Sequence, residues 1–440
     1  MNETLLLVVL VAFSFAISRL LSRYASKYFV ASGIEYLLLG IILGSKGPAK
    51  VLSLETLGKF APLINLLLGL VGFLLGLRAR SSLRPANVAI GGIVSSLALI
   101  AIVAAATLGL LEFFVEPAAD VTRLQIFRIP LDSAGLSLYA EASAEHLWLS
   151  LAIGCAAAVS SPVLIAQSAS LHRARGPTLD TLLGYAMVGQ LVAIAVFGVT
   201  LAWARAAESA DIFRIPIGLW AAVTVAAGIL IGLLFNLFIG RDRDEMKIYV
   251  AALGTVIFAA GTGSALGVSP LVVNLIAGVV VSFTSRHASR LEVTLMPIRH
   301  PILVLLRLFA GALWLPVTGL LWLVPPVYVI VRIIGRWFTT WASAWMVRRI
   351  PRVPRLGLGL VGQGGLAVAI AVSFAQRFPE QAPVALTTIL GGIILSDFWS
   401  YWAVRRILAD AGETDAAIDD AETSASRTRT RAHRVVGGGH

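Results

Sequence analysis

Four ionisable side chains deep inside long apolar stretches, where charges are rare, are candidates for chemistry. They are Asp397 in TTILGGIILSDFWSYWAV, Arg332 in VYVIVRIIGRWF, Arg307 in LVLLRLFAGALW and Glu35 in GIEYLLLGIILG. A charge at the bilayer centre costs about 2.5–3.5 kcal/mol on insertion scales, so such residues are candidates for binding ions or protons. Structural alternatives stay open: Asp397 could pair with a neighbouring serine or an arginine, and Glu35 could pack beside Tyr36.

Two apolar stretches contain residues that interrupt a helix. Leu356–Ala375 (LGLGLVGQGGLAVAIAVSFA) holds five glycines and Gln363, and Leu149–Ser170 holds Ser160 and Ser161 followed by a proline. Interrupted backbone at membrane depth is tolerated only when it is buried in protein or lines a wet cavity. Paired interruptions in two halves of a chain indicate a transporter binding site. The alternative is a pair of helices that pack closely through small residues.

The composition indicates a polytopic membrane protein and argues against several other classes. The chain has 440 residues, of which 58% are hydrophobic and 13% charged, against about 25% charged in soluble domains. The net charge of +11 is explained by basic cytoplasmic loops, so we expect no nucleic-acid partner. The single cysteine, Cys155, excludes an intrachain disulfide and a cysteine metal cluster. The histidines lie in loops or at span ends, so we expect neither an enzyme nor a cofactor or bound metal.

Apolar stretches of roughly membrane-spanning length recur along the chain. We predict about 13 transmembrane helices, at Thr4–Leu21, Phe29–Gly44, Ala61–Leu77, Ala86–Leu111, Leu147–Ser170, Leu179–Ala204, Ile215–Ile239, Ile248–Leu266, Leu271–Phe283, Ile302–Pro316, Gly319–Met346, Leu356–Ala375 and Ala385–Leu408. Lys and Arg are concentrated on alternate loops, which predicts an external N-terminus and a cytoplasmic C-terminus.

The spans predict an inverted repeat. The interrupted fifth span and the sixth correspond to the interrupted twelfth and the thirteenth, and an offset of seven spans inverts the second unit. We therefore divide the transmembrane domain, residues 1–408, into repeat 1 (about 1–204), a linker helix (about 215–239) and repeat 2 (about 246–408). The segment 112–146 is predicted to be an external excursion, and 409–440 a disordered cytoplasmic tail.

With these features, the chain resembles the monovalent cation:proton antiporter superfamily of sodium/proton and Kef-type exchangers. The resemblance covers nearly all of residues 1–408 and is strongest in four stretches: GIEYLLLGIILG (33–44), LINLLLGLVGFLLGLRA (63–79), AAAVSSPVLIA (156–166) and GLVGQGGLAVAIA (359–371). It implies an all-α fold in which two discontinuous helices cross, a moving core, a scaffold domain and a homodimer.

The ion-binding motif departs from the family pattern. The resemblance implies an acidic pair or Asn-Asp on the sixth span, where this chain has Gly189 and Gln190 in GYAMVGQLVAIAVFG. A glutamine can coordinate through its carbonyl oxygen but cannot exchange a proton at physiological pH. The family mechanism therefore does not transfer to this position.

Other residues are candidates to replace the missing acid. Asp397 lies near the symmetry counterpart of that site and is the candidate for the titrating group. Arg332 is expected to compensate the negative C-terminal ends of the interrupted helices, as a basic residue does in the resembling family, whereas Arg336 is expected to extend toward the cytoplasm. Hydroxyl and amide dipoles are expected from Ser160, Ser161, Gln190 and Gln363, with Glu35 and Arg307 as secondary candidates and a salt bridge expected for Arg307.

These observations predict a secondary active transporter in a prokaryotic plasma membrane that exchanges a monovalent cation, Na+ or K+, for H+ by alternating access. Because Gly189 and Gln190 replace the acidic pair, a different class stays open: an uncoupled channel or uniporter, or an anion transporter, on the same fold. A non-transporting sensor or scaffold is a third alternative.

Overall fold

The computed structural model describes residues 33–115, 133–208, 217–239, 244–347, 353 and 355–414, and every regular element within them is a helix. The predicted first span, Thr4–Leu21, and residues 415–440 of the predicted tail lie outside the described part of the chain. Eight described helices are long and apolar enough to cross a membrane, and four shorter apolar helices accompany them. The all-α membrane fold is therefore confirmed, whereas the count of 13 and the boundaries of the two repeats stay predictions.

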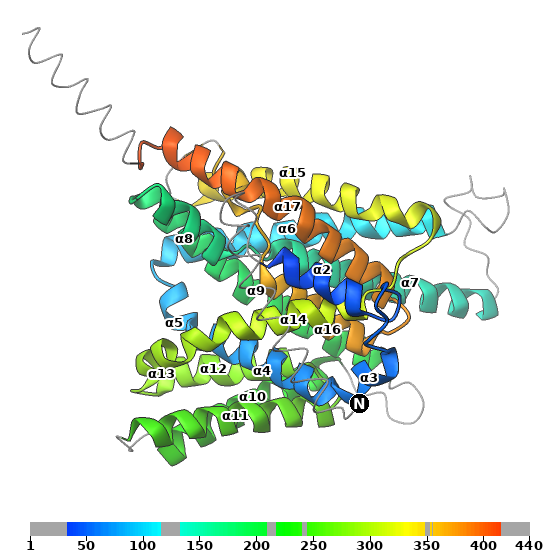
Figure 1. Ribbon diagram of the computed structural model, residues 1–440, viewed down its shortest axis with the longest axis horizontal. Coiled ribbons are helices and arrows are strands. Elements are labelled where there is room, and N and C mark those ends of the chain that lie inside the picture. The colour runs from blue at the N-terminus through cyan, green and yellow to red at the C-terminus, as the bar shows by residue number, and fades with distance from the viewer. Residues whose placement is uncertain are drawn as a thin grey trace, which may run out of the picture.

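The helices form two groups (Figure 1). The scaffold group packs around α4 and α12, and it contains α2 (Ile34–Leu43), α3 (Leu54–Lys59), α4 (Ala61–Leu77), α5 (Ala79–Ser82), α10 (Ile217–Ile239), α11 (Glu245–Ala265), α12 (Pro270–Thr284), α13 (Ala288–Leu295), η1 (Met296–Ile298) and α14 (Arg299–Leu313). The core group contains α6 (Ala86–Val115), α7 (Ser133–Ala158), α8 (Pro162–Leu171), α9 (Pro177–Glu208), η2 (Gly319–Leu323), α15 (Val324–Met346), η3 (Leu356–Leu360), α16 (Gly365–Arg377) and α17 (Ala382–Asp410).

Glycines allow the scaffold helices to approach closely. On α4, a Cβ at Gly72 would overlap the carbonyl oxygen of Leu271 in α12, and one at Gly76 would overlap that of Leu275. On α12, a Cβ at Gly278 would in turn overlap the carbonyl oxygen of Phe73. In lipid, where apolar burial between helices contributes little, such backbone-to-backbone contact is a main source of helix association. The contact between α4 and α12 therefore depends on small residues on the facing sides of both helices.

The structure extends α7 into the segment predicted to be an external excursion. That helix begins at Ser133, well before the predicted start of the fifth span at Leu147. The sequence SAGLSLYAEASAE is rich in Ala, Leu and Glu, which favour helices. Residues 116–132 of the excursion lie outside the described residues.

The last described residues contact the core group. Helix α17 continues to Asp410, and the buried carboxylate of Glu413 accepts hydrogen bonds from the backbone N–H groups of Thr178 (2.7 Å) and Leu179 (3.0 Å). Glu413 therefore satisfies N–H groups in the first turn of α9. Within this segment Glu413 and Thr414 are buried, whereas Asp410 is exposed.

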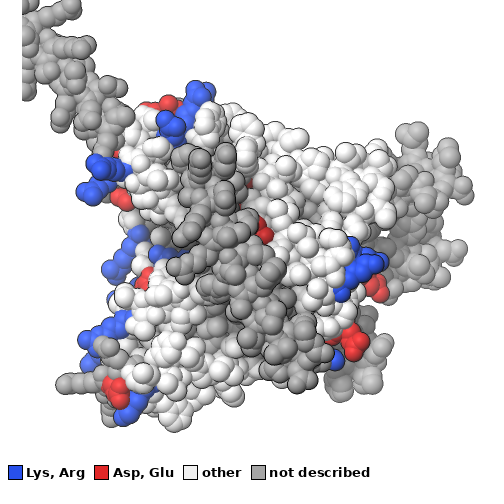
Figure 2. Space-filling model, in the orientation of Figure 1, with Lys and Arg blue, Asp and Glu red and all other residues white. Residues whose placement is uncertain are grey.

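Basic side chains gather at one end of the molecule. Figure 2 shows Lys and Arg along the edge that holds α5, α13 and the end of α17. The described basic residues of these elements include Arg80 in α5, Arg290 in α13, and Arg405 and Arg406 in α17. This clustering is what the positive-inside rule describes.

The close approach of α4 and α12 predicts that two glycine substitutions differ in their effect on stability. Gly76→Ala should lower the free energy of unfolding by about 1–3 kcal/mol, because its Cβ meets backbone that cannot rotate away. Gly254→Ala, in α11 with open space around it, should leave stability unchanged or raise it by up to about 1 kcal/mol. Thermal unfolding of the purified variants in detergent measures both, and equal midpoints would contradict the packing described.

Candidate functional site

The two interrupted helices meet in extended segments within the core group. Helix α7 ends at Ala158 and η3 at Leu360, while α8 and α16 begin a few residues later. The segments bind each other directly: the Ser161 N–H donates to the Gly362 carbonyl (2.8 Å), and the Ser160 Oγ donates to the Leu360 carbonyl (2.7 Å). We call this region the crossing, and the predicted pair of interruptions is what forms it.

Local sequence explains why the helices stop and restart here. Pro162 has no N–H, so it fits the first position of α8, and Ser161 caps that helix by accepting from the Leu164 N–H (3.4 Å). Gly364 has φ +69°, a conformation that side chains rarely adopt, and a Cβ there would overlap the Ser161 side chain. Serine, proline and glycine thus place two helix N-terminal ends and two C-terminal ends close together.

Two buried arginines of α15 satisfy the C-terminal ends. Arg332 donates from Nε to the Ala157 carbonyl (2.9 Å), from Nη2 to the Val159 carbonyl (2.9 Å) and from Nη1 to the Val361 carbonyl. Arg336 donates to the Ala158 carbonyl and to the Ser160 Oγ (3.0 Å). The last carbonyls of a helix carry partial negative charge, so a cation is favoured beside them.

Arg332 lies beside the C-terminal ends of the interrupted helices, and the structure corrects the interpretation of Arg336. Arg336 is 1% exposed and contributes to the crossing, and it does not extend toward the cytoplasm. The two arginines are spaced i,i+4 and therefore lie on the same face of α15. The same spacing is visible in the sequence, and it indicates that Arg336 shares the surroundings of Arg332.

Asp397 lies at the positive end of α16. Its Oδ1 accepts the Gln363 N–H (2.9 Å) just before the helix begins, and the side chain is 4% exposed. The charges of Arg307 in α14 and Arg332 in α15 both lie within electrostatic range of this carboxylate. Among the described residues, Asp397 is the acidic side chain that reaches the crossing.

Two glutamines bind the crossing through their amide nitrogens. Gln190 Nε2 donates to the Ser160 carbonyl (2.8 Å), and Gln363 Nε2 donates to the Ala156 carbonyl (3.1 Å) and to the Tyr328 hydroxyl. The buried Oε1 of Gln363 accepts no hydrogen bond from any described residue. A buried acceptor without a donor needs a partner, so this oxygen is available to a ligand or water.

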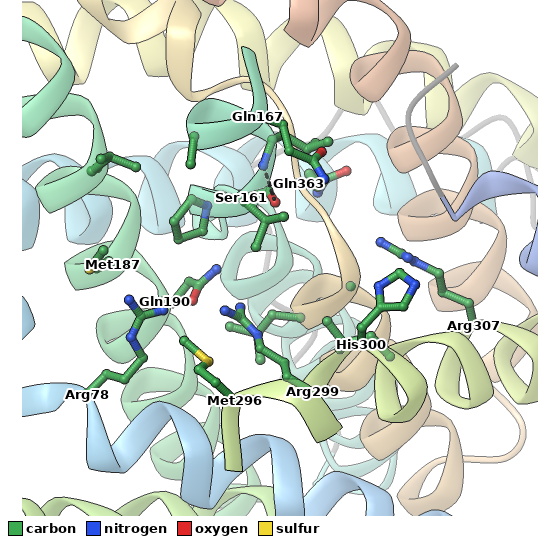
Figure 3. A pocket seen from close by; sticks show the side chains of 18 of the residues that line it. Arg78, Ser161, Gln167, Met187, Gln190, Met296, Arg299, His300, Arg307 and Gln363 are labelled. Atoms are coloured by element: carbon green, nitrogen blue, oxygen red, sulfur yellow. Dashed lines mark hydrogen bonds between the residues drawn. The ribbon is translucent and has the colours of Figure 1, made fainter. Parts of the chain in front are cut away.

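A cavity of about 690 Å3 reaches the crossing from between the two helix groups. Its lining includes four of the predicted site residues, namely Ser161, Gln190, Gln363 and Arg307. It also includes polar, sulfur-containing and basic residues that were not predicted: Arg78, Gln167, Met187, Met296, Arg299 and His300. Figure 3 shows these side chains around the cavity. Ser160, Arg332 and Asp397 do not line it and lie behind its wall.

Glu35 lies apart from the crossing, at the start of α2. Its Oε2 accepts the Gly33 N–H (2.7 Å), and Arg307 is within electrostatic range. Arg307 therefore lies between two acidic residues, Glu35 and Asp397, that belong to different helix groups. No cluster of acidic, histidine or cysteine side chains suited to a metal ion occurs in the part of the chain that the structure describes.

Interrupted helices that cross at membrane depth beside a cavity are typical of secondary transporters. The chain belongs to the sodium/hydrogen exchanger family, whose transmembrane model matches residues 9–400. The resemblance identified from the sequence is thereby confirmed, and this family consists of transporters.

Comparison with solved structures supports the same fold. The chain is similar to the sodium proton antiporter MjNhaP1 from Methanocaldococcus jannaschii, solved at pH 8, with a TM-score of 0.63 and 14% identity. The similarity covers 92% of this chain and 99% of that one. A search of curated proteins gives no match.

The role of Arg332 can be tested by removing its charge. Arg332→Gln should lower the free energy of unfolding by at least about 2 kcal/mol, because several buried carbonyls lose their donor. Arg405→Gln, an exposed change at the end of α17, is the matched control. Thermal unfolding of both purified variants is the measurement, and an Arg332→Gln midpoint equal to the control would show that the crossing does not need this arginine.

Proposed function

We propose that this chain is a secondary active transporter that exchanges a monovalent cation for H+, with Asp397 as the proton-binding group. The observation that carries the proposal is the position of Asp397: it is the described acidic side chain at the crossing, and basic residues of both helix groups act on it. A carboxylate is needed because the same group must hold a proton in one state and favour a cation in another.

A proton has a short route to Asp397. Gln363 is among the residues that line the cavity, and its backbone N–H binds the Asp397 carboxylate, so one residue separates the carboxylate from the cavity. When Asp397 is ionised, the N-terminal end of α16 stabilises it. When it takes up a proton, that attraction is lost, and the crossing changes its charge.

Neutral oxygens next to the cavity are the proposed cation ligands. The Gln363 Oε1 has no donor among the described residues, and the Ser161 side chain lines the same end of the cavity. Carbonyl and hydroxyl oxygens suit Na+ or K+. We assign Gln190 the same role through its Oε1, while its Nε2 holds the Ser160 carbonyl.

Alternating access follows if the core group moves against the scaffold group. The cavity lies between these groups, with α8, α9 and α16 on one side and α4 and α14 on the other. The basic end seen in Figure 2 supports a cytoplasmic placement of its mouth, with the N-terminus outside. The proposal includes a homodimer in a prokaryotic plasma membrane, in line with the organism of the structural neighbour.

The proposal is tested with Asp397→Asn in proteoliposomes. The substitution keeps an oxygen that accepts the Gln363 N–H, so the fold should be retained while the titratable group is lost. With an imposed pH gradient, adding Na+, K+ or Li+ should collapse the gradient for the wild-type chain. We expect the variant to be slower by at least about tenfold, as when an essential proton-transfer group is removed.

Asp410→Asn, an exposed change on the same helix, is the control and should retain the wild-type rate. Cation-driven collapse that survives Asp397→Asn would overturn the assignment of Asp397. If folded wild-type protein shows no collapse with any of the three cations, the exchange proposal fails, and conductance without proton coupling would then identify a channel or uniporter.

A further inference from the structure

The cavity that leads to the crossing is lined by cations and not by acids. Arg78, Arg299, Arg307 and His300 contribute to its wall, and its described lining contains no Asp or Glu. Figure 3 shows Arg299, His300 and Arg307 entering from α14, with Arg78 beside Gln190 on the opposite side. This lining is unusual for the route of a cation, because like charges repel more strongly in a partly dry cavity than in water.

Arg299 is the least compensated of these groups. It makes no hydrogen bond or ion pair within the described residues, and the charges that act on it come from two other arginines, Arg78 and Arg307. It also lines a small adjoining space with Arg78 and Gln190. A partly buried guanidinium surrounded by like charges is held at an energetic cost unless an anion joins it.

The neighbouring arginines differ from Arg299 in having acids of the protein close to them. Arg78 Nε lies 3.0 Å from Glu292 Oε1, an ion pair that does not have hydrogen-bond geometry. Arg307 is within range of Glu35 and Asp397, and both of these acids lie outside the cavity wall. The first turn of α8, with Ser161 as its cap, adds the positive end of a ten-residue helix to the same cavity.

We propose that this cavity binds a small anion, a halide, a carboxylate or sulfate, between Arg299 and the N-terminal end of α8. The guanidinium of Arg299 supplies the charge, His300 and Arg307 line the same wall, and the amide of Gln167 lies at the α8 side. The proposed anion site consists only of residues that line the cavity. The proposal therefore does not depend on whether the chain exchanges cations for protons. A bound anion would also offset the positive charge of the arginines that a cation must pass to reach Gln363.

The test measures anion binding directly, without transport. Purified full-length protein in detergent, kept in gluconate salts, is titrated with radiolabelled chloride, acetate and sulfate in turn, and bound counts are measured at equilibrium. At least one of these anions should bind saturably. Arg299→Gln should weaken that binding by at least about tenfold, the usual consequence of removing one partner of a desolvated charge pair.

Two further variants keep the result interpretable. Arg299→Lys retains the charge and should retain most of the affinity, and Arg286→Gln removes an exposed arginine at the same end of the scaffold group and should have no effect. Each variant is compared with the wild type by size-exclusion chromatography to establish that it is folded. If none of the three anions binds saturably to the wild type, or if Arg299→Gln binds as tightly as Arg286→Gln, the proposal is overturned.

Discussion

The structure depends on satisfying the backbone groups that two interrupted helices expose at membrane depth. Lipid supplies no hydrogen bonds, so each free carbonyl must find a donor inside the protein. The side chains of Arg332 and Arg336 provide these donors to the ends of α7 and η3, and both arginines are almost completely buried. The crossing can exist because α15 carries two cations on one face.

The use of two arginines as donors gives the crossing an excess of positive charge. Two arginines and one aspartate reach the crossing among the described residues, and Asp397 is already engaged at the N-terminal end of α16. The position at which the resembling exchangers have an acid is Gln190 here, which adds no charge. The arginines along the cavity extend the same positive field toward its mouth. Under the proposed function, Asp397 is the group at the crossing that attracts a cation, and a bound anion would add to that attraction.

Much of this arrangement could be predicted from local sequence, and the rest needed the three-dimensional packing. Glycine and Ser-Ser-Pro patterns predicted both interruptions because these residues act on backbone geometry directly, and Arg332 was recognisable as a charge within an apolar helix. The hydrogen bond from the Gln363 N–H to Asp397 could not be predicted, because it depends on how α17 packs against the start of α16. The proximity of Arg78 to Arg299 could not be predicted either, because it arises from the packing of α4 against α14.

The central claim, a surplus of positive charge at the crossing, is tested most directly by Gln190→Glu. The measurement is the difference in unfolding midpoint between this variant and the wild type as pH is raised from about 4 to 8, across the range where a carboxyl ionises. We predict that the variant gains stability relative to the wild type as pH rises, because the arginines favour the ionised carboxylate. A relative loss of stability with rising pH would contradict the account, because it would mean that burial outweighs any positive surplus.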